Sequence, residues 1–234
     1  MTYFLDRRDA GRRLAQQLAK YRDTRPVVIG LPRGGVPVAD EVARALNAVL
    51  DVLVVRKLGA PGNPEFAIGA IAPGVTHLER DHLQALNVPT AFVQHAVARE
   101  QAELRRREQL FREGRPEAEV GGKTVILVDD GLATGASVKA AVKSLRARSP
   151  GRIVLAVPIG APDTVTDLRA EVDELVCLET PAFFRAVGQG YVDFSPTSDT
   201  DVVRILRGRH MEAEEGDVRL TEPSASSGGG RSST

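Results

Sequence analysis

The 234-residue sequence contains no tryptophan, few phenylalanine and tyrosine residues, and a single cysteine. A lone cysteine, Cys177, excludes an internal disulfide framework and is typical of a protein kept in a reducing cytosol. The scarcity of aromatic side chains disfavours the stacking platforms with which proteins bind single-stranded nucleic acid. We therefore expect a cytoplasmic protein whose stability comes from a hydrophobic core.

Net charge and long hydrophobic runs are absent as well. The 31 basic and 31 acidic side chains cancel, so no overall field attracts nucleic acid or a membrane surface. No stretch approaches the ~18 apolar residues that a membrane span needs. The charged segment 1–13 also lacks the apolar centre of a signal peptide. The sequence predicts no membrane partner and disfavours a nucleic-acid partner on charge grounds.

What the chain does contain is a series of short apolar runs that alternate with helical patterns. This alternation predicts an α/β fold, with a Rossmann-like, open, mainly parallel sheet flanked by helices. The expected strands lie at 26–31, 49–55, 125–128, 152–157 and 175–178. The expected helices lie at 9–21, 36–46, 89–112, 138–148 and 162–170.

Three other segments have a different character. Residues 56–64 are rich in glycine and proline, which predicts an irregular mobile segment, and 66–71 with 75–78 fit a small hairpin. Residues 180–206 hold four aromatic side chains and are interpreted as a small hood over the carboxyl ends of the strands. We expect one domain over 1–208 and, from the acidic, serine and glycine composition that follows, a disordered tail over 209–234.

Residues 125–137 carry the most functional information. They read Val-Ile-Leu-Val-Asp-Asp-Gly-Leu-Ala-Thr-Gly-Ala-Ser. An apolar strand ends in two carboxylates, and a loop of small residues then opens a helix. Backbone N–H groups at such a helix start favour a phosphate. The carboxylates repel phosphate but accept hydrogen bonds from sugar hydroxyls or hold a divalent cation. Together these groups predict a sugar-phosphate site.

This segment resembles the 5-phosphoribosyl 1-pyrophosphate (PRPP) signature of the type I phosphoribosyltransferases. In that resemblance Asp129 and Asp130 bind the ribose hydroxyls. The 5-phosphate would be bound by Ala133, Thr134, Gly135, Ala136 and Ser137. Without the loop that follows, Asp129-Asp130-Gly131 would be an ordinary polar turn at a strand end.

Three further stretches resemble the same family in the expected order. The first, after the strand at 26–31, would bind pyrophosphate and carry a cis Pro32–Arg33 bond; it consists of Pro32, Arg33, Gly34 and Gly35. The second resembles the mobile catalytic loop and supplies Arg56 and Lys57, with Glu65 as a candidate proton carrier. The third resembles the base-binding hood of hypoxanthine-guanine enzymes, with Phe184, Val187 and Tyr191, and with Asp193 as a metal contact. Each of these assignments has a plain alternative. Residues 32–35 would be an ordinary strand-to-helix turn, and Arg56 with Lys57 a solvated basic pair. Glu65 would be a solvated loop residue, and Asp193 a surface residue of the hood.

The resemblance implies a Mg²⁺-dependent enzyme of nucleotide salvage. It would transfer ribose 5-phosphate from PRPP to a nucleobase or related nitrogen acceptor and release pyrophosphate. Two departures leave the acceptor open: Ala133 stands where hypoxanthine-guanine enzymes have an aspartate, and the acidic stretch 169–174 replaces a lysine that reads the base. The alternatives are a non-catalytic PRPP sensor that binds RNA or DNA, and a degenerate partner domain. A homodimer is compatible with the sequence, which does not fix the oligomeric state.

Overall fold

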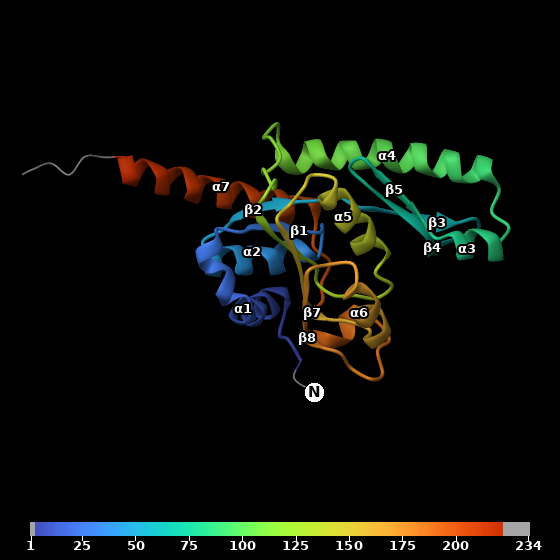
Figure 1. The fold of residues 1–234 in the computed structure, drawn as a ribbon, viewed down its shortest axis with the longest axis horizontal. Coiled ribbons are helices and arrows are strands. Elements are labelled where there is room, and N and C mark those ends of the chain that lie inside the picture. Colours follow the sequence, from blue (N-terminus) through green and yellow to red (C-terminus); the bar gives the residue numbers. More distant parts are fainter. Residues whose placement is uncertain (1–2, 222–234) are drawn as a thin grey trace, which may run out of the picture.

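The structure is a computed structural model that describes residues 3–221, and its centre is a five-stranded parallel sheet (Figure 1). The strand order is β2-β1-β6-β7-β8, and every neighbouring pair is parallel. These strands are β1 (Val27–Gly30), β2 (Val49–Val52), β6 (Thr124–Val128), β7 (Arg152–Ile159) and β8 (Glu174–Glu179). The predicted open, mainly parallel α/β architecture is confirmed.

Helices cover both faces of this sheet. One face is covered by α1 (Arg7–Gln17), α2 (Gly35–Leu46) and α7 (Asp199–Thr221), and the other by α5 (Ala136–Arg146) and α6 (Pro162–Leu168). The remaining helices, α3 (Arg80–Ala85) and α4 (Thr90–Arg112), pack against a second sheet. Successive side chains of a strand point to opposite faces. Val28 and Ile126 therefore pack with α1, α2 and α7, whereas Ile29 and Leu127 pack with α5 and α6. Burial on both faces explains why each strand is uniformly apolar in sequence.

A second, three-stranded antiparallel sheet stands beside the first. Its strands are β3 (Arg56–Ala60), β4 (Asn63–Ala72) and β5 (Val75–Leu78), with α4 lying along it (Figure 1). The predicted hairpin is confirmed, but the prediction of an irregular segment over 56–64 is wrong. Gly62 takes a positive φ of 73° in a tight turn, and the pairing of β3 with β4 shifts register at Gly59. The turn and the register shift accommodate the glycines and prolines within a hairpin.

Helix α7 changes the expected ends of the hood and of the folded domain. The hood was expected over 180–206, but Val202, Ile205 and Leu206 belong to the first turns of α7 and are buried in the core. Their helical spacing produces one apolar face, so the hood is confined to 180–198. The helix also continues to Thr221, where a disordered tail from 209 was expected. Residues 222–234 of that tail lie outside the described residues.

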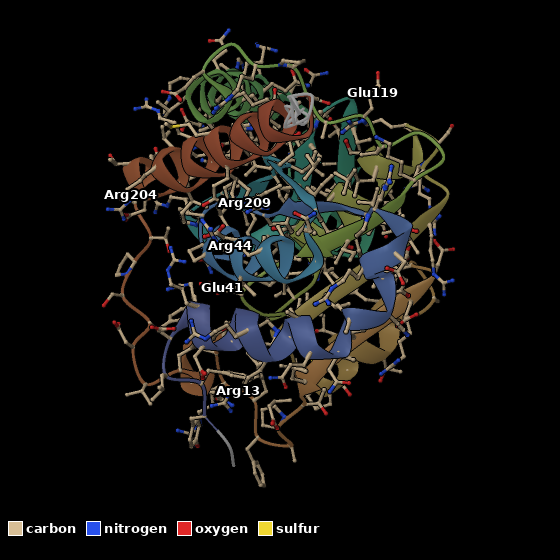
Figure 2. The ribbon with its side chains drawn as sticks, turned by 90° about the vertical axis from the view of Figure 1, so that its left-hand side faces the viewer. Arg13, Glu41, Arg44, Glu119, Arg204 and Arg209 are labelled. Carbon is tan, nitrogen blue, oxygen red and sulfur yellow. The ribbon has the colours of Figure 1, made fainter. Side chains whose placement is uncertain are left out.

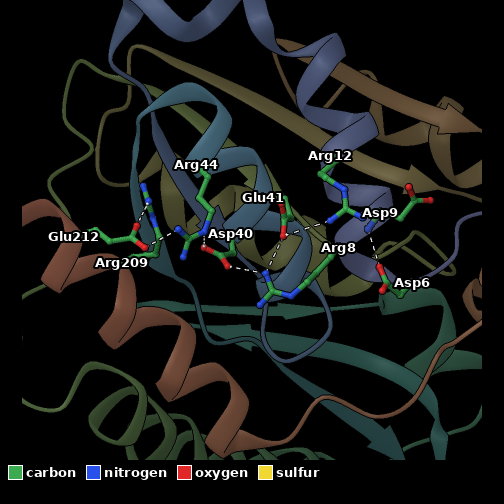
Figure 3. A network of polar contacts seen from close by, with 9 residues as sticks. All are labelled: Asp6, Arg8, Asp9, Arg12, Asp40, Glu41, Arg44, Arg209 and Glu212. Carbon is green, nitrogen blue, oxygen red and sulfur yellow. Dashed lines mark hydrogen bonds and ion pairs between the residues drawn. The ribbon is translucent and has the colours of Figure 1, made fainter.

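A polar network ties α7 to the rest of the fold beyond residue 208. Arg44 on α2 pairs with Glu212 on α7 at 2.6 Å and with the buried Asp40 at 3.1 Å (Figure 3). Arg8 on α1 pairs with Asp40 at 3.2 Å from the other side. Figure 2 views this face, where Arg44 lies between α1 and the labelled Arg209 of α7. The α7 residues past 208 that take part in this network therefore belong to the folded unit.

Among the described helices, none is both long and apolar enough to cross a membrane.

Candidate active site

The twin aspartates lie at the carboxyl end of β6 and line a cavity of about 160 Å³. Both side chains are partly buried, and the backbone N–H of Asp130 donates to Asp129 Oδ1 at 2.9 Å. The same cavity is lined by Lys57, Gly131, Leu132, Ala133, Thr134, Gly135, Ser137, Val138 and Val187. The fold thus brings together residues from β3, from the β6–α5 loop and from the hood, as the family resemblance implied.

The loop after the aspartates leads directly into the first turn of α5. Gly135 precedes the helix with a positive φ of 72°, a conformation that glycine adopts without strain. Thr164 on α6 donates its hydroxyl to Ala133 O at 2.6 Å and so fixes the loop from behind. Ala136, expected beside Ser137 in the phosphate loop, is buried at the helix start. The unpaired N–H groups of the first helical turn make this end of α5 attractive to an anion.

The loop after β1 lies against the aspartates. A Cβ placed on Gly35 would be 2.7 Å from Val128 O, and one on Gly34 would be 1.9 Å from Asp130 Oδ2. Only glycine fits this contact between the loops of two adjacent parallel strands. The Pro32–Arg33 peptide bond is cis, as expected from the resemblance.

The side chains of this loop are arranged differently from the expectation. Arg33 pairs with Asp199 at the start of α7 at 3.6 Å and does not line the aspartate cavity. Pro32 lines a second cavity of about 580 Å³, which shares Lys57 and Ser137 with the first. The second cavity lies between this loop, the β3–β4 hairpin and α4. The two cavities therefore adjoin at Lys57 and Ser137.

The two basic residues of β3 have different environments. Lys57 lines both cavities, and its positive charge opposes in part the rise that burial causes in the pKa of Asp129. Arg56 lines only the second cavity and donates from Nη2 to Glu100 Oε2 at 2.8 Å. Glu100, which the sequence did not single out, lies on α4 and also accepts from Arg99. Position 65 belongs to β4, and the side chain of Glu65 lies outside the described part of the structure.

Burial dominates the electrostatics of the aspartates. It raises the pKa of Asp129 well above its usual range, with a further contribution from the neighbouring Asp130. Burial also raises the pKa of Asp130, but the guanidinium of Arg7 opposes that shift. Arg7 Nε donates to Asp130 Oδ2 at 2.8 Å. No sequence motif pointed to Arg7, because it lies in another element far from the aspartates along the chain.

The hood contributes one side chain to the cavity and places two others elsewhere. Val187 lines the cavity, whereas Phe184 and Tyr191, also expected to contact a base, belong to an apolar cluster around Phe4. Tyr191 donates its hydroxyl to Asp130 O at 2.5 Å, and burial raises its pKa. In this arrangement Tyr191 supports the backbone of the aspartate pair rather than the cavity wall.

The described residues contain no protein cage for a metal. Among the side chains that the structure describes, which exclude those of residues 65 and 213–221, no group of three His, Cys, Asp or Glu is arranged to hold an ion. Asp193, the expected metal contact, is exposed and accepts from the N–H and the hydroxyl of Ser195 at 2.8 and 2.5 Å. The adjacent carboxylates of Asp129 and Asp130 supply oxygen ligands that suit Mg²⁺ when a substrate supplies further oxygens. The residues present therefore fit a cation that arrives with an oxygen-rich ligand.

Comparison with known proteins gives a consistent result. Over 216 residues, covering 92% of this chain and 49% of the relative, the sequence is 50% identical to a protein of Mycobacterium tuberculosis provisionally named as a phosphoribosyl transferase. The chain thus spans about half the length of this curated relative. It is 29% identical over 119 residues to the bifunctional protein PyrR of Deinococcus deserti, covering 49% of this chain and 64% of PyrR.

A solved structure and a family model agree with that relationship. The crystal structure of TT1426 from Thermus thermophilus is 47% identical, covers 87% of this chain and 97% of its own, and superimposes with a TM-score of 0.74. Residues 5–194 match the model of the phosphoribosyl transferase domain, and that range includes both loops beside the aspartates. On this evidence the chain belongs to the phosphoribosyl transferase domain family.

Proposed function

We propose that the protein transfers ribose 5-phosphate from PRPP to a nitrogen acceptor and releases pyrophosphate. The observation that carries this proposal is the shared cavity of Asp129, Asp130, Lys57 and the loop 133–137 at the start of α5. A phosphate-binding helix end lies beside two hydroxyl-binding carboxylates, and a lysine stands at the junction with the larger cavity. This combination of groups is complementary to PRPP.

In the proposed complex each group has one task. The helix start at Ala136 and the hydroxyls of Thr134 and Ser137 bind the 5-phosphate. Asp129 and Asp130 accept hydrogen bonds from the ribose hydroxyls. The glycines of the β1 loop allow the backbone to approach closely, and the loop 32–35 would supply N–H donors to pyrophosphate.

The reaction is a substitution at ribose C1. The acceptor nitrogen donates its electron pair to C1, the C1–O bond to pyrophosphate breaks, and that bond's electrons leave with pyrophosphate. The acceptor proton passes to water or to a carboxylate, for which Glu65 is the proposed carrier. Lys57 would offset the negative charge that develops on the leaving group. Arg56 would contribute to the same effect if its ion pair with Glu100 opens. Most of the acceleration then comes from positioning and electrostatics.

A divalent cation fits this scheme as a companion of the substrate. Asp129 and Asp130, together with Asp193, would help to hold Mg²⁺, and the cation would supply positive charge that offsets part of the charge of the leaving group. We further propose a nucleobase or a related amine as the acceptor and the cytoplasm, with its reducing conditions, as the location.

The direct test is pyrophosphate release from PRPP and Mg²⁺ with a panel of nucleobases and amines, together with calorimetric titration of PRPP. The expected result is PRPP binding and base-dependent release. Asp129→Asn should weaken PRPP binding by ~10-fold or more, because a hydrogen bond to a charged group contributes ~1.5–3 kcal/mol. Asp81→Asn, which changes the same charge on the exposed α3, serves as the matched control.

Two outcomes would contradict the proposal in different ways. If the wild-type protein gives neither heat nor a thermal shift with PRPP and Mg²⁺, the assignment of the cavity is wrong. If PRPP binds but no acceptor yields pyrophosphate, the non-catalytic sensor is favoured, and salt-sensitive binding to RNA or DNA is the next measurement.

A further inference from the structure

Arg7 makes a set of contacts that no phosphate-binding motif includes. Its Nε donates to Asp130 Oδ2 at 2.8 Å, and its Nη1 donates to the backbone oxygen of Ser195 at 2.8 Å. Its guanidinium carbon also lies 3.9 Å from the ring centre of Phe194. Only 11% of the Arg7 side chain and 15% of the Asp130 side chain are exposed. One arginine thus joins the ribose carboxylate to the hood.

The N-terminal segment is built to hold Arg7 in that place. The N–H of Phe4 donates to Gly190 O at 2.9 Å, and the N–H of Val192 donates to Phe4 O at 2.8 Å. The segment therefore pairs with the hood in a parallel manner just before α1 begins at Arg7. The position of Arg7 follows from backbone pairing as well as from its own side-chain contacts.

The carboxylate is enclosed from other sides as well. Asp129 precedes it on the chain, Lys57 faces the same cavity, and Gly34 lies directly against Asp130 Oδ2. Tyr191 from the hood donates to the Asp130 backbone oxygen. Among these neighbours only Arg7 both neutralises the carboxylate and fixes its direction, because a guanidinium is a rigid, permanently charged donor.

We propose that Arg7 is a positioning residue for PRPP: it holds the Asp130 carboxylate in its ribose-binding orientation and locks the hood to it. Arg7 acts through Asp130 and through the hood backbone. The inference rests on the proposed function, because it assigns Asp130 to the ribose. Removing Arg7 leaves a largely buried carboxylate without its charged partner and removes the side-chain contacts of Arg7 with Phe194 and Ser195 in the hood.

The test is a double-mutant cycle on PRPP affinity with the complete chain. The variants are Arg7→Gln, Arg7→Lys, Asp130→Asn, the Arg7→Gln/Asp130→Asn pair and the control Arg8→Gln. Arg8 lies next along α1, carries the same charge and pairs with Asp40 and Glu41 (Figure 3), and it does not line the cavity. We expect Arg7→Gln to weaken PRPP binding by ~10-fold or more, and Arg8→Gln to leave it unchanged.

Two further readouts separate positioning from a general structural role. In the Asp130→Asn background, Arg7→Gln should cause a smaller loss than in the wild type, because the part of its effect that passes through the carboxylate is already gone. Arg7→Lys should restore part of the affinity, and KM for PRPP should rise more than kcat falls. Hydrogen exchange of the hood amides 187–195 should quicken in Arg7→Gln and not in Arg8→Gln. If Arg7→Gln does not fold, the cycle is run with Arg7→Lys.

The outcomes distinguish this inference from the function on which it rests. If wild-type protein binds PRPP and Arg7→Gln behaves as Arg8→Gln does, the role of Arg7 is refuted while the function stands. Losses that simply add in the Asp130→Asn background also refute it, since Arg7 would then act elsewhere. If wild-type protein does not bind PRPP, the proposed function fails and this inference fails with it.

Discussion

Replacing Gly34 by alanine tests how closely the β1 loop and the Asp130 carboxylate are packed. A Cβ at this position would lie 1.9 Å from Asp130 Oδ2 and 2.6 Å from its Cγ, where ordinary contacts begin at 3.4 Å. The backbone of Gly34 has φ −63° and ψ −33°, which alanine adopts readily. Any effect therefore arises from the contact and not from backbone strain.

The magnitude follows from what has to move. The carboxylate cannot stay in place, and Arg7 holds it at 2.8 Å. Overpacking costs ~1–3 kcal/mol and a weakened hydrogen bond between charged groups ~1.5–3 kcal/mol, so we expect a loss of about 3 kcal/mol in the free energy of unfolding. For a chain of this size that loss corresponds to a Tm lower by ~6–12 °C.

The assay combines thermal unfolding with PRPP calorimetry on Gly34→Ala and on a matched control. Gly208→Ala is the control, because no heavy atom lies within 4 Å of its added Cβ and it lies inside α7. It should gain ~0.5–1 kcal/mol from the better helix propensity of alanine. Gly34→Ala should also bind PRPP ~10-fold more weakly, since the carboxylate is displaced. A Gly34→Ala protein with wild-type Tm and wild-type PRPP affinity would show that the β1 loop does not press on the Asp130 carboxylate.

Three other perturbations address the rest of the site. Because the pKa of Asp129 lies well above its usual range, PRPP affinity measured by calorimetry should fall as the pH drops through that raised pKa; affinity independent of pH would contradict this. The stability of the unliganded protein should depend on pH in the opposite direction. The neutral Asp129 carboxyl favours the folded state, so its contribution to Tm is lost as the pH rises through the raised pKa. In thermal melts, Asp129→Asn should remove this dependence of Tm on pH. Lys57→Ala should lower turnover more than PRPP affinity, and a variant with full turnover would remove Lys57 from the chemistry. Glu100→Gln weakens the partner of Arg56, so urea unfolding should show a loss of ~1–2 kcal/mol, and an unchanged midpoint would mean that the pair does not stabilise the fold.

The local pattern of the sequence sufficed for the elements that depend on neighbouring residues. The apolar run 125–128 predicted β6 and its place in a parallel sheet, because a strand buried on both faces has no polar alternation. The long charged pattern at 89–112 predicted α4 within one residue at its start. The aspartates, the small-residue loop and the helix start are contiguous in sequence, so their position beside one cavity follows from the strand-loop-helix pattern.

The structure departs from local sequence patterns where a segment has a partner outside itself. The segment 56–64 looked irregular from its glycines and prolines, yet pairing with β4 makes most of it a strand. Tyr191 looked like a base contact, yet its hydroxyl goes to the backbone of Asp130. The first partner is the next strand of a hairpin and the second lies in a separate loop, and the composition of neither segment indicates its partner.

Local properties such as strand burial, helix periodicity and glycine conformation were enough to predict the parallel α/β scaffold and the order of its loops. The contact of Arg7 with Asp130, the pairing of Glu100 with Arg56, and the junction of the two cavities at Lys57 and Ser137 emerge from the packing of the folded chain. Such ion pairs and cavities form between side chains from separate elements. Their existence depends on how the helices and sheets pack and not on the spacing of residues along the chain.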